Sequence, residues 1–234
     1  MKVSVITTLY NYREYIEDCI KSFLNQDFKD SEIIVVDDCS TDNPLDAIEK
    51  YLGERVRYIR LPEKANYSIA KNVGIQNSKS EVLVMLDADD MLTRKGISIR
   101  YKKLMEGFDF VHGPCWILYE NGSKIRGTVW QKYLRTRDPR DIHAQTVMLR
   151  KDIHRKIGLY DESLWNSSDR EMWIRIHNYN YKVGIVNEEV SVYRIHPKQM
   201  HASKKKMASL SEFLALVEEK SKKRRVDLFD VRML

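Results

Sequence analysis

Short apolar runs alternate with amphipathic segments through the first 90 residues of the chain. The runs are rich in valine and isoleucine, as expected of strands, and the segments between them place apolar side chains at helical spacing. Strands that alternate with helices in this way are typical of a largely parallel sheet. The predicted strands cover residues 3–8, 32–37, 56–60 and 82–86, and the predicted helices cover residues 15–25, 45–52 and 68–77.

The regular alternation ends after residue 90. Polar and basic residues dominate residues 122–141, which we predict to be a loop. Strands and helices around this loop follow no fixed order, so we expect mixed elements here instead of further βαβ units. The predicted helices are residues 93–105, 167–177 and 209–223, and the predicted strands lie within residues 108–119 and at 144–149, 182–186 and 190–194.

Carboxylates follow two of the predicted strands. Asp37 and Asp38 end the second strand, and Asp87, Asp89 and Asp90 follow the strand at residues 82–86. In open α/β sheets, ligands bind at the carboxyl ends of the strands. Crowded carboxylates repel one another unless a cation or a proton intervenes, and Mg²⁺ or Mn²⁺ is held by one or two carboxylates with water and phosphate oxygens. The alternative is a solvated acidic turn before the next helix.

Composition places the chain among soluble globular proteins. Its 234 residues are 43% hydrophobic and 32% charged, far from the composition of a disordered chain. The formal charge of +6 is unevenly distributed, because residues 1–90 carry 11 Lys and Arg against 17 Asp and Glu, whereas the rest carries 29 against 17. The acidic part fits a nucleoside diphosphate only through a divalent cation. The basic part fits an anionic acceptor, a nucleic acid or a membrane surface, or consists of solvated helix faces.

The sequence predicts no membrane span, since its apolar runs are far shorter than the required length of about 20 residues. The N-terminus lacks the pattern of a signal peptide, so we expect a cytoplasmic protein. Lys and Arg clusters flank the predicted helix at residues 209–223, which would allow contact with the inner face of the membrane or a homodimer. Three cysteines without a CxxC pair argue against disulfides and a zinc site.

Several separated motifs resemble the family 2 glycosyltransferases of the GT-A fold. Their order and spacing carry the resemblance, because each motif alone is weak. The resemblance extends over roughly residues 3 to 197. The motifs lie at residues 3–11, 22–26, 33–42, 70–75 and 84–90, and a later block lies at residues 158–162, 168–175 and 193–196.

The resemblance implies an α/β fold with a Rossmann-like, nucleotide-binding mixed sheet flanked by helices. Residues 1–200 would form the GT-A catalytic domain, with a nucleotide-sugar-binding half at residues 1–92 and an acceptor-binding half at residues 93–200. Residues 201–234 would form a basic helical tail.

The resemblance also assigns a donor site. Thr8 and Tyr10 match the residues that line the base pocket, and Asp38 matches the carboxylate that accepts a hydrogen bond from the base, usually uracil. Asp87 matches the carboxylate near the ribose. Lys71 stands near the nucleotide where the family commonly has arginine, so it keeps the charge but lacks the forked guanidinium.

Four further positions complete the implied site. Asp89 matches the main metal ligand, and His196 would complete the shell of a Mn²⁺ or Mg²⁺ ion, while Arg194 would lie near the diphosphate. Asp169 matches the proposed general base, although Ser168 replaces the glutamate that precedes it in the family. A carboxylate at this position is also suited to the first turn of a helix, and the two roles are compatible.

The implied activity is inverting transfer of a sugar from a nucleoside-diphosphate sugar, a UDP-sugar by default, to an acceptor hydroxyl in surface glycan or polysaccharide synthesis. Two alternatives remain open at the level of sequence. The basic second half would also suit a modified phage DNA base as acceptor, and a catalytically silent nucleotide-sugar-binding protein would keep most of the motifs. A nucleotidyltransferase is disfavoured, because the segment after the first strand contains no glycine.

Overall fold

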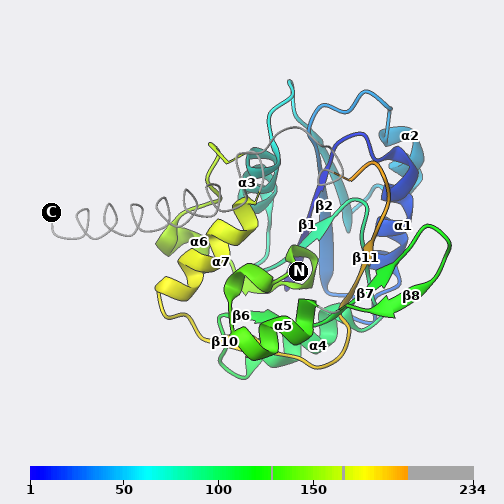
Figure 1. The fold of residues 1–234 in the computed structure, drawn as a ribbon. Coiled ribbons are helices and arrows are strands. Elements are labelled where there is room, and N and C mark those ends of the chain that lie inside the picture. The colour runs from blue at the N-terminus through cyan, green and yellow to red at the C-terminus, as the bar shows by residue number, and fades with distance from the viewer. Residues whose placement is uncertain (128, 165–166, 200–234) are drawn as a thin grey trace, which may run out of the picture.

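The computed structural model describes residues 1–127, 129–164 and 167–199, which form an α/β fold around a seven-stranded sheet (Figure 1). The strand order is β10-β6-β9-β4-β1-β2-β3. Strands β4, β1, β2 and β3 are parallel, whereas β9 runs antiparallel between β4 and β6. The strands are β1 (Val3–Leu9), β2 (Ser31–Asp37), β3 (Val56–Arg60), β4 (Val82–Asp87), β6 (Phe110–His112), β9 (Met148–Arg150) and β10 (Val183–Ile185).

A smaller four-stranded sheet has the order β5-β11-β7-β8. Its strands are β5 (Met91–Leu92), β7 (Cys115–Leu118), β8 (Lys124–Arg126) and β11 (Ser191–Arg194). Strand β5 follows the acidic run directly and pairs with β11 through Val192 and Met91. This pairing brings a strand from the end of the described chain back to the acidic run.

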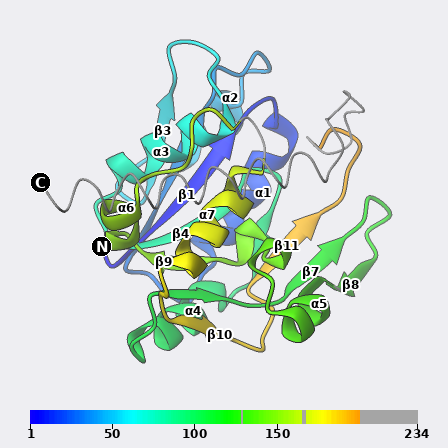
Figure 2. The same ribbon diagram turned by 60° about the vertical axis from the view of Figure 1, so that its left-hand side comes forward.

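Helices cover both faces of the large sheet (Figure 2). Strand β1 is buried on both faces, and its alternate side chains enter different cores: Val5 packs with α1, α2 and α4, and Ile6 packs with α3, α6 and α7. A strand covered on both faces is rich in apolar and β-branched residues, and the valine, isoleucine and threonine of β1 made it predictable from the sequence. The helices are α1 (Arg13–Leu24), α2 (Leu45–Ile48), α3 (Tyr67–Asn77), α4 (Gly96–Met105), α5 (Val129–Thr136), α6 (Asp152–Ile157) and α7 (Ser168–Asn178).

The structure corrects the sequence predictions mainly after residue 90. The predicted loop at residues 122–141 contains β8, α5 and a 3₁₀ turn (Pro139–Asp141). Strand β8 escaped prediction because its side chains are exposed and it pairs with only one strand, β7. The predicted strand at residues 144–149 begins with a 3₁₀ turn (Ala144–Thr146) and becomes β9 only at Met148. The predicted helix at residues 209–223 lies outside the described residues.

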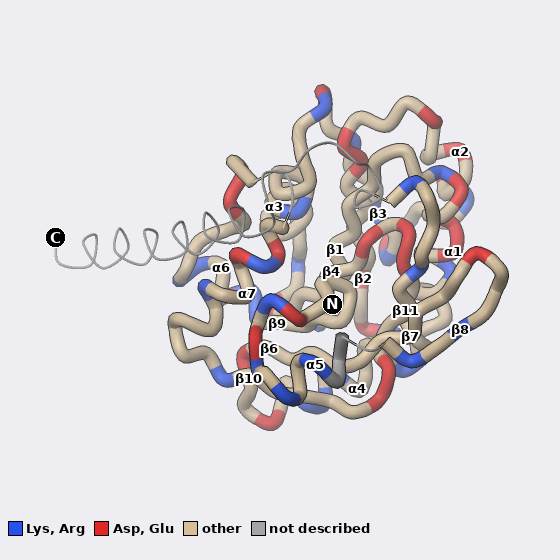
Figure 3. Tube along the Cα trace, viewed as in Figure 1, with Lys and Arg blue, Asp and Glu red and all other residues tan. Residues whose placement is uncertain are grey.

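Lysine and arginine in the second half are distributed over many elements, with several on and beside α5 (Figure 3). Some of them are already paired, since Arg126 lies 2.5 Å from a carboxylate oxygen of Glu189 and Lys132 lies 2.7 Å from one of Asp141. These two basic side chains are therefore paired with carboxylates of the same half of the chain. No helix within residues 1–127, 129–164 and 167–199 is long and apolar enough to cross a membrane. All three cysteines are free.

Candidate active site

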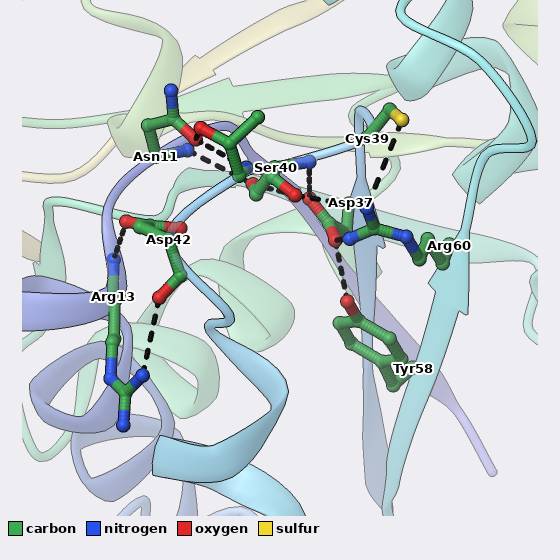
Figure 4. A network of polar contacts seen from close by, with 9 residues as sticks. Asn11, Arg13, Asp37, Cys39, Ser40, Asp42, Tyr58 and Arg60 are labelled. Atoms are coloured by element: carbon green, nitrogen blue, oxygen red, sulfur yellow. Dashed lines mark hydrogen bonds and ion pairs between the residues drawn. The ribbon is translucent and has the colours of Figure 1, made fainter.

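The loops that follow β1 and β2 are fastened to each other at the carboxyl edge of the sheet (Figure 4). Asn11 adopts a left-handed φ of 55°, a conformation that asparagine tolerates better than most residues. Its side-chain oxygen accepts a hydrogen bond from Thr41 N at 2.8 Å, and its own N–H donates to Ser40 Oγ at 2.9 Å. Asp42 accepts a hydrogen bond from Arg13 N at 2.9 Å. The two loops therefore form one unit.

Asp37 is the buried centre of this unit. One of its oxygens accepts hydrogen bonds from Ser40 N at 2.9 Å and Ser40 Oγ at 2.5 Å. The other accepts from the Tyr58 hydroxyl at 2.5 Å and from Arg60 Nη1 at 2.6 Å. Asp37 is fully buried by these partners, so its role is structural. It fixes the end of β2, from which Asp38 extends.

Asp38 and Tyr10 lie together at the same edge. One Asp38 oxygen accepts a hydrogen bond from Ala65 N at 2.7 Å, and the other forms an ion pair with Lys64. The Lys64 ammonium also lies 3.5 Å from the centroid of the Tyr10 ring, which is well exposed. Lys64 therefore contacts two of the three residues that the family resemblance assigns to the nucleotide base, Tyr10 and Asp38. The sequence alone gave no signal for Lys64, which lies in a loop.

Asp87 and Asp169 meet through a tyrosine. Strand pairing sets Thr8 of β1 beside Asp87 of β4. The Tyr67 hydroxyl lies 2.8 Å from Asp87 Oδ1 and 3.1 Å from Asp169 Oδ2. The other Asp169 oxygen forms an ion pair with Lys71, whose side chain is almost fully buried. Residues from α3, β4 and α7 thus converge on one small polar cluster.

Burial governs the protonation of this cluster. Burial raises the pKa of Asp87 to about 6, against the opposing charge of Lys71 and with the support of the neighbouring Asp169 carboxylate. Burial also raises the pKa of Tyr67 well above its usual value, and the nearby carboxylates add to this shift. The Tyr67 hydroxyl is therefore protonated throughout the physiological range and is available as a hydrogen-bond donor.

The remainder of the acidic run contacts β11 and the segment after it. Asp89 Oδ2 lies 3.0 Å from His196 Nε2, and Asp90 Oδ1 accepts a hydrogen bond from Arg194 N at 2.9 Å. The Arg194 guanidinium donates to the Asp89 carbonyl at 3.1 Å and to Asp18 Oδ2 at 2.8 Å. The His196 ring also packs against α1 and the loop before it, through two tyrosine rings.

The residues present fit a divalent cation that takes two ligands from the protein and the others from water and phosphate oxygens. In the described part of the chain, no three side chains of the His, Cys, Asp or Glu type form a complete metal-binding group. Asp89 and His196 supply one carboxylate and one imidazole, and both are nearly buried. Within the same part, Asp90 Oδ2 and His196 Nδ1 have no hydrogen-bond partner. Two protein ligands suffice for Mn²⁺ or Mg²⁺ when phosphate and water oxygens fill the other positions.

The structure brings together all nine residues that the sequence analysis assigned to the site, at the carboxyl edge of β1, β2 and β4 and in the elements beside it. They form three groups: Thr8, Tyr10 and Asp38; Lys71, Asp87 and Asp169; and Asp89, Arg194 and His196. The sequence analysis missed Tyr67, Lys64 and Asp18. Only Tyr67 carried a usable signal, because it lies four residues before Lys71 and hence on the same face of α3.

Comparison with known proteins identifies the family. The profile described as Glycosyl transferase family 2 matches residues 4–157. TuaG of Bacillus subtilis, whose name assigns it provisionally to teichuronic acid biosynthesis, is 25% identical over 91% of this chain and 86% of its own length. A Campylobacter jejuni enzyme named GalNAc(5)-diNAcBac-PP-undecaprenol beta-1,3-glucosyltransferase is 36% identical over 50% of this chain and 38% of its own length.

Solved structures agree on the fold. TarS of S. aureus in complex with UDP-GlcNAc superposes with a TM-score of 0.77 at 21% identity, over 93% of this chain and 65% of the TarS chain. The mannosyltransferase PcManGT of Pyrobaculum calidifontis, in complex with GDP-Man and Mn²⁺, gives a TM-score of 0.70 at 19% identity, over 86% of this chain and 59% of its own. This chain therefore spans about three fifths of those proteins. With the α/β architecture and the profile match together, the chain belongs to the family 2 glycosyltransferases and has their GT-A fold.

Proposed function

We propose that this glycosyltransferase moves a sugar from a UDP-sugar to an acceptor hydroxyl, with inversion at the anomeric carbon, in the synthesis of a surface glycan. The TarS complexes contain UDP or UDP-GlcNAc, and the names of two relatives refer to teichuronic acid and to a lipid-linked glycan. The PcManGT complex contains GDP-Man, so a guanine nucleotide is the donor to be tested against uridine.

The observation that carries the proposal is the short path between the donor and acceptor carboxylates. Asp87 is assigned to the ribose and Asp169 is assigned as the general base. The Tyr67 hydroxyl lies 2.8 Å from Asp87 and 3.1 Å from Asp169, and so links the two carboxylates. They lie 82 positions apart in the chain and on different elements. A displacement reaction needs the donor and the group that activates the acceptor to lie side by side, and this arrangement meets that need.

The donor would bind across the carboxyl edge of the sheet. Tyr10 offers an exposed ring on which a base stacks, and Asp38 is oriented by Ala65 N to accept a hydrogen bond from the base. Lys64 would have to leave the Tyr10 ring first, and its side chain is 47% exposed, so it can move into solvent. Asp87 would then accept a ribose hydroxyl.

Asp169 would act as the general base. It takes the proton of the acceptor hydroxyl while the oxygen attacks the anomeric carbon on the face opposite the diphosphate, and the bond from that carbon to the diphosphate oxygen breaks. One displacement inverts the configuration and requires no covalent intermediate. A positioned base of this kind contributes about 10²- to 10⁴-fold to the rate. The Asp169 side chain is 18% exposed, so an acceptor can reach it.

Asp89 and His196 are the residues that would hold a Mn²⁺ or Mg²⁺ ion. The chemistry that such an ion supplies when bound is neutralisation of the negative charge on the departing diphosphate. Arg194 would add a second positive charge there, although its guanidinium also holds Asp18 and the Asp89 carbonyl. His196 Nε2 and Asp89 Oδ2 are now at hydrogen-bond distance. The two side chains would therefore have to move apart for both to bind an ion.

The donor is tested by thermal shift with UDP-, GDP- and CMP-sugars, each with and without Mn²⁺. We expect stabilisation by one UDP-sugar, and only when metal is present, because ligands that bind the folded state raise its stability. Stabilisation by GDP-sugars alone would refute the uridine assignment. Stabilisation without any release of nucleoside diphosphate would instead identify a silent nucleotide-sugar-binding protein.

The assignment of Asp169 as the general base is tested with Asp169→Asn. We expect the rate at which the enzyme releases UDP from a UDP-sugar to fall about 10²- to 10⁴-fold, while the affinity for UDP changes little. Asp152→Asn is the matched control, since Asp152 also lies in the first turn of a helix but forms only an exposed pair with Lys156. An unchanged rate for Asp169→Asn would refute this assignment.

A further inference from the structure

Tyr67 occupies the centre of the site, yet the proposed mechanism gives it no role. It is the first residue of α3, and its hydroxyl lies within hydrogen-bond distance of Asp87 and of Asp169. A tyrosine hydroxyl has one proton to donate, so it serves one carboxylate at a time and links the two. Among the described residues it is the single side chain that contacts both carboxylates through hydrogen bonds that the structure defines.

The backbone beneath Tyr67 is held firmly. Asn66 caps α3 by accepting a hydrogen bond from Ile69 N at 3.0 Å, and its side-chain amide donates to the Glu162 carbonyl at 2.9 Å. Ser68 Oγ donates to the Leu164 carbonyl at 2.7 Å. The residues on either side of Tyr67 are thus bound to residues 162–164. The backbone that carries the Tyr67 ring is therefore held against this segment.

Asp169 depends on α3 for its orientation. It is the second residue of α7, and the preceding Ser167 makes no side-chain capping hydrogen bond. One Asp169 oxygen forms an ion pair with Lys71 and the other meets the Tyr67 hydroxyl. Lys71 follows Tyr67 by four residues, and its ammonium lies 4.0 Å from the centroid of the Tyr67 ring. Tyr67 and Lys71 thus hold the two oxygens of the same carboxylate from adjacent turns of one helix.

We infer that Tyr67 is a positioning residue for the general base: its hydroxyl, held in place by α3, donates its one proton to Asp169 when a ribose hydroxyl of the donor serves Asp87, and so fixes the plane of the Asp169 carboxylate. The inference rests on the proposed function of Asp169. A single hydrogen bond from Lys71 leaves a carboxylate free to turn about that contact, whereas two donors on different oxygens define its plane. Each oxygen keeps a second lone pair, so Asp169 remains able to take a proton.

Removing the hydroxyl lowers the rate through geometry. The carboxylate loses its fixed plane, and misplacement of a reacting group by about 1 Å lowers a rate by roughly 10²-fold. Donor binding is affected little, because the Asp87 oxygen that Tyr67 contacts can be served by the ribose hydroxyl or by water.

The test is Tyr67→Phe, which keeps the ring beside Lys71 and removes only the hydroxyl. With UDP-GlcNAc, UDP-glucose and Mn²⁺ as probes, and water as acceptor, we expect kcat for UDP release to fall about 10- to 100-fold. We expect the KM for the donor to stay within about twofold of wild type. Such a loss of kcat at an unchanged KM is a change that a purely structural residue would not produce.

Tyr160→Phe is the matched control. Tyr160 is a buried tyrosine whose ring lies 5.1 Å from the Lys71 ammonium, and its hydroxyl has no hydrogen-bond partner within the described residues. It should turn over the donor with the kcat and KM of the wild type. A wild-type kcat for Tyr67→Phe would overturn the inference, and so would an equal loss in Tyr160→Phe.

A double-mutant cycle separates failure of this inference from failure of the proposed function. If Tyr67 acts through Asp169, Tyr67→Phe should have almost no further effect on UDP release in the Asp169→Asn background. If Asp169→Asn alone releases UDP at the wild-type rate, the base assignment fails and the inference fails with it. If Asp169→Asn is inactive and Tyr67→Phe is fully active, only the inference fails. The coupling of the two substitutions in urea unfolding gives a reading that needs no turnover, and a value near zero would also refute the contact.

Discussion

Replacing Asp37 with asparagine should destabilise the fold without touching the site directly. The substitution keeps the size of the side chain and the oxygen that accepts from Ser40 N and Ser40 Oγ. The new amide nitrogen would face the Tyr58 hydroxyl, which can turn to accept, and Arg60 Nη1, which cannot. Two donors would then oppose each other across a contact that is now 2.6 Å long.

The size of the effect follows from what each partner does next. Arg60 loses a hydrogen bond to a charged acceptor, which contributes about 1.5–3 kcal/mol. Its side chain is 46% exposed and keeps a 2.9 Å hydrogen bond to the Ser40 carbonyl, so water replaces part of the loss. We therefore expect the free energy of unfolding to fall by about 2 kcal/mol, roughly a thirtyfold change in the folding equilibrium.

Urea unfolding followed by circular dichroism measures this change. Asp30→Asn is the control, because Asp30 is an exposed carboxylate on the loop before β2 whose cationic neighbours lie 3.7 and 3.9 Å away. Its replacement should alter the free energy of unfolding by less than about 0.5 kcal/mol. If Asp37→Asn cost no more than Asp30→Asn, the reasoning that makes Asp37 the structural centre of the two loops would be refuted.

Three further effects should be measurable. Gly74→Ala should lower the free energy of unfolding by about 1–3 kcal/mol, because its new methyl group would lie 2.4 Å from Ile6 Cγ2. Burial lowers the pKa of His154 to about 3. Between about pH 6.5 and 3, this histidine therefore binds a proton in the unfolded chain but not in the folded chain. Stability should therefore fall as pH decreases from about 6.5 towards 3, by up to about 1.4 kcal/mol per pH unit from this histidine, and His154→Gln should flatten that slope. Removing divalent cations with a chelator should abolish the thermal stabilisation by the donor, as measured by differential scanning fluorimetry.

Each of these effects has a control or a contrary outcome. Gly53→Ala is the partner of Gly74→Ala, because a methyl group there meets no atom within 4 Å. Equal stability of the two alanine variants would show that the Ile6 contact relaxes without cost. A pH slope that His154→Gln leaves unchanged would mean that other groups produce the acid dependence. Undiminished donor stabilisation in the chelator would contradict the proposed metal site.

The sequence predicts the donor half well for a physical reason. Strands β1, β2 and β4 are covered on both faces, so they contain apolar runs, such as Ile33–Val36 and Val82–Leu86, that stand out from their surroundings. Parallel strands end at one edge, so the sequence predicts that Asp38 and Asp87 lie at the same edge of the sheet. The family motifs supplied Asp169, Arg194 and His196, which strand patterns alone do not place.

The features that escaped prediction depend on distant contacts. Tyr67 contacts Asp169, about 100 positions later, and this contact depends on the packing of α3 against residues 160–164. Lys64 lies in a loop, and its contacts with Tyr10 and Asp38 follow from how that loop returns to the sheet. The eight-residue α5 lies within a stretch dominated by polar and basic residues, and β5 has only two residues. In these places the local sequence permits several structures and the tertiary fold selects one.

The antiparallel strand β9 has a consequence for folding during synthesis on the ribosome. Leu83 of β4 pairs with Leu149, so the strand that leads to the acidic run is flanked on one side by residues made about sixty positions later. At about 5–20 residues per second, roughly 3 to 12 seconds separate the synthesis of β4 from that of its neighbour. During that interval an apolar strand edge is open to other nascent chains, which is a known route to aggregation. Slow translation between β4 and β9 should therefore increase the demand of this protein for chaperones.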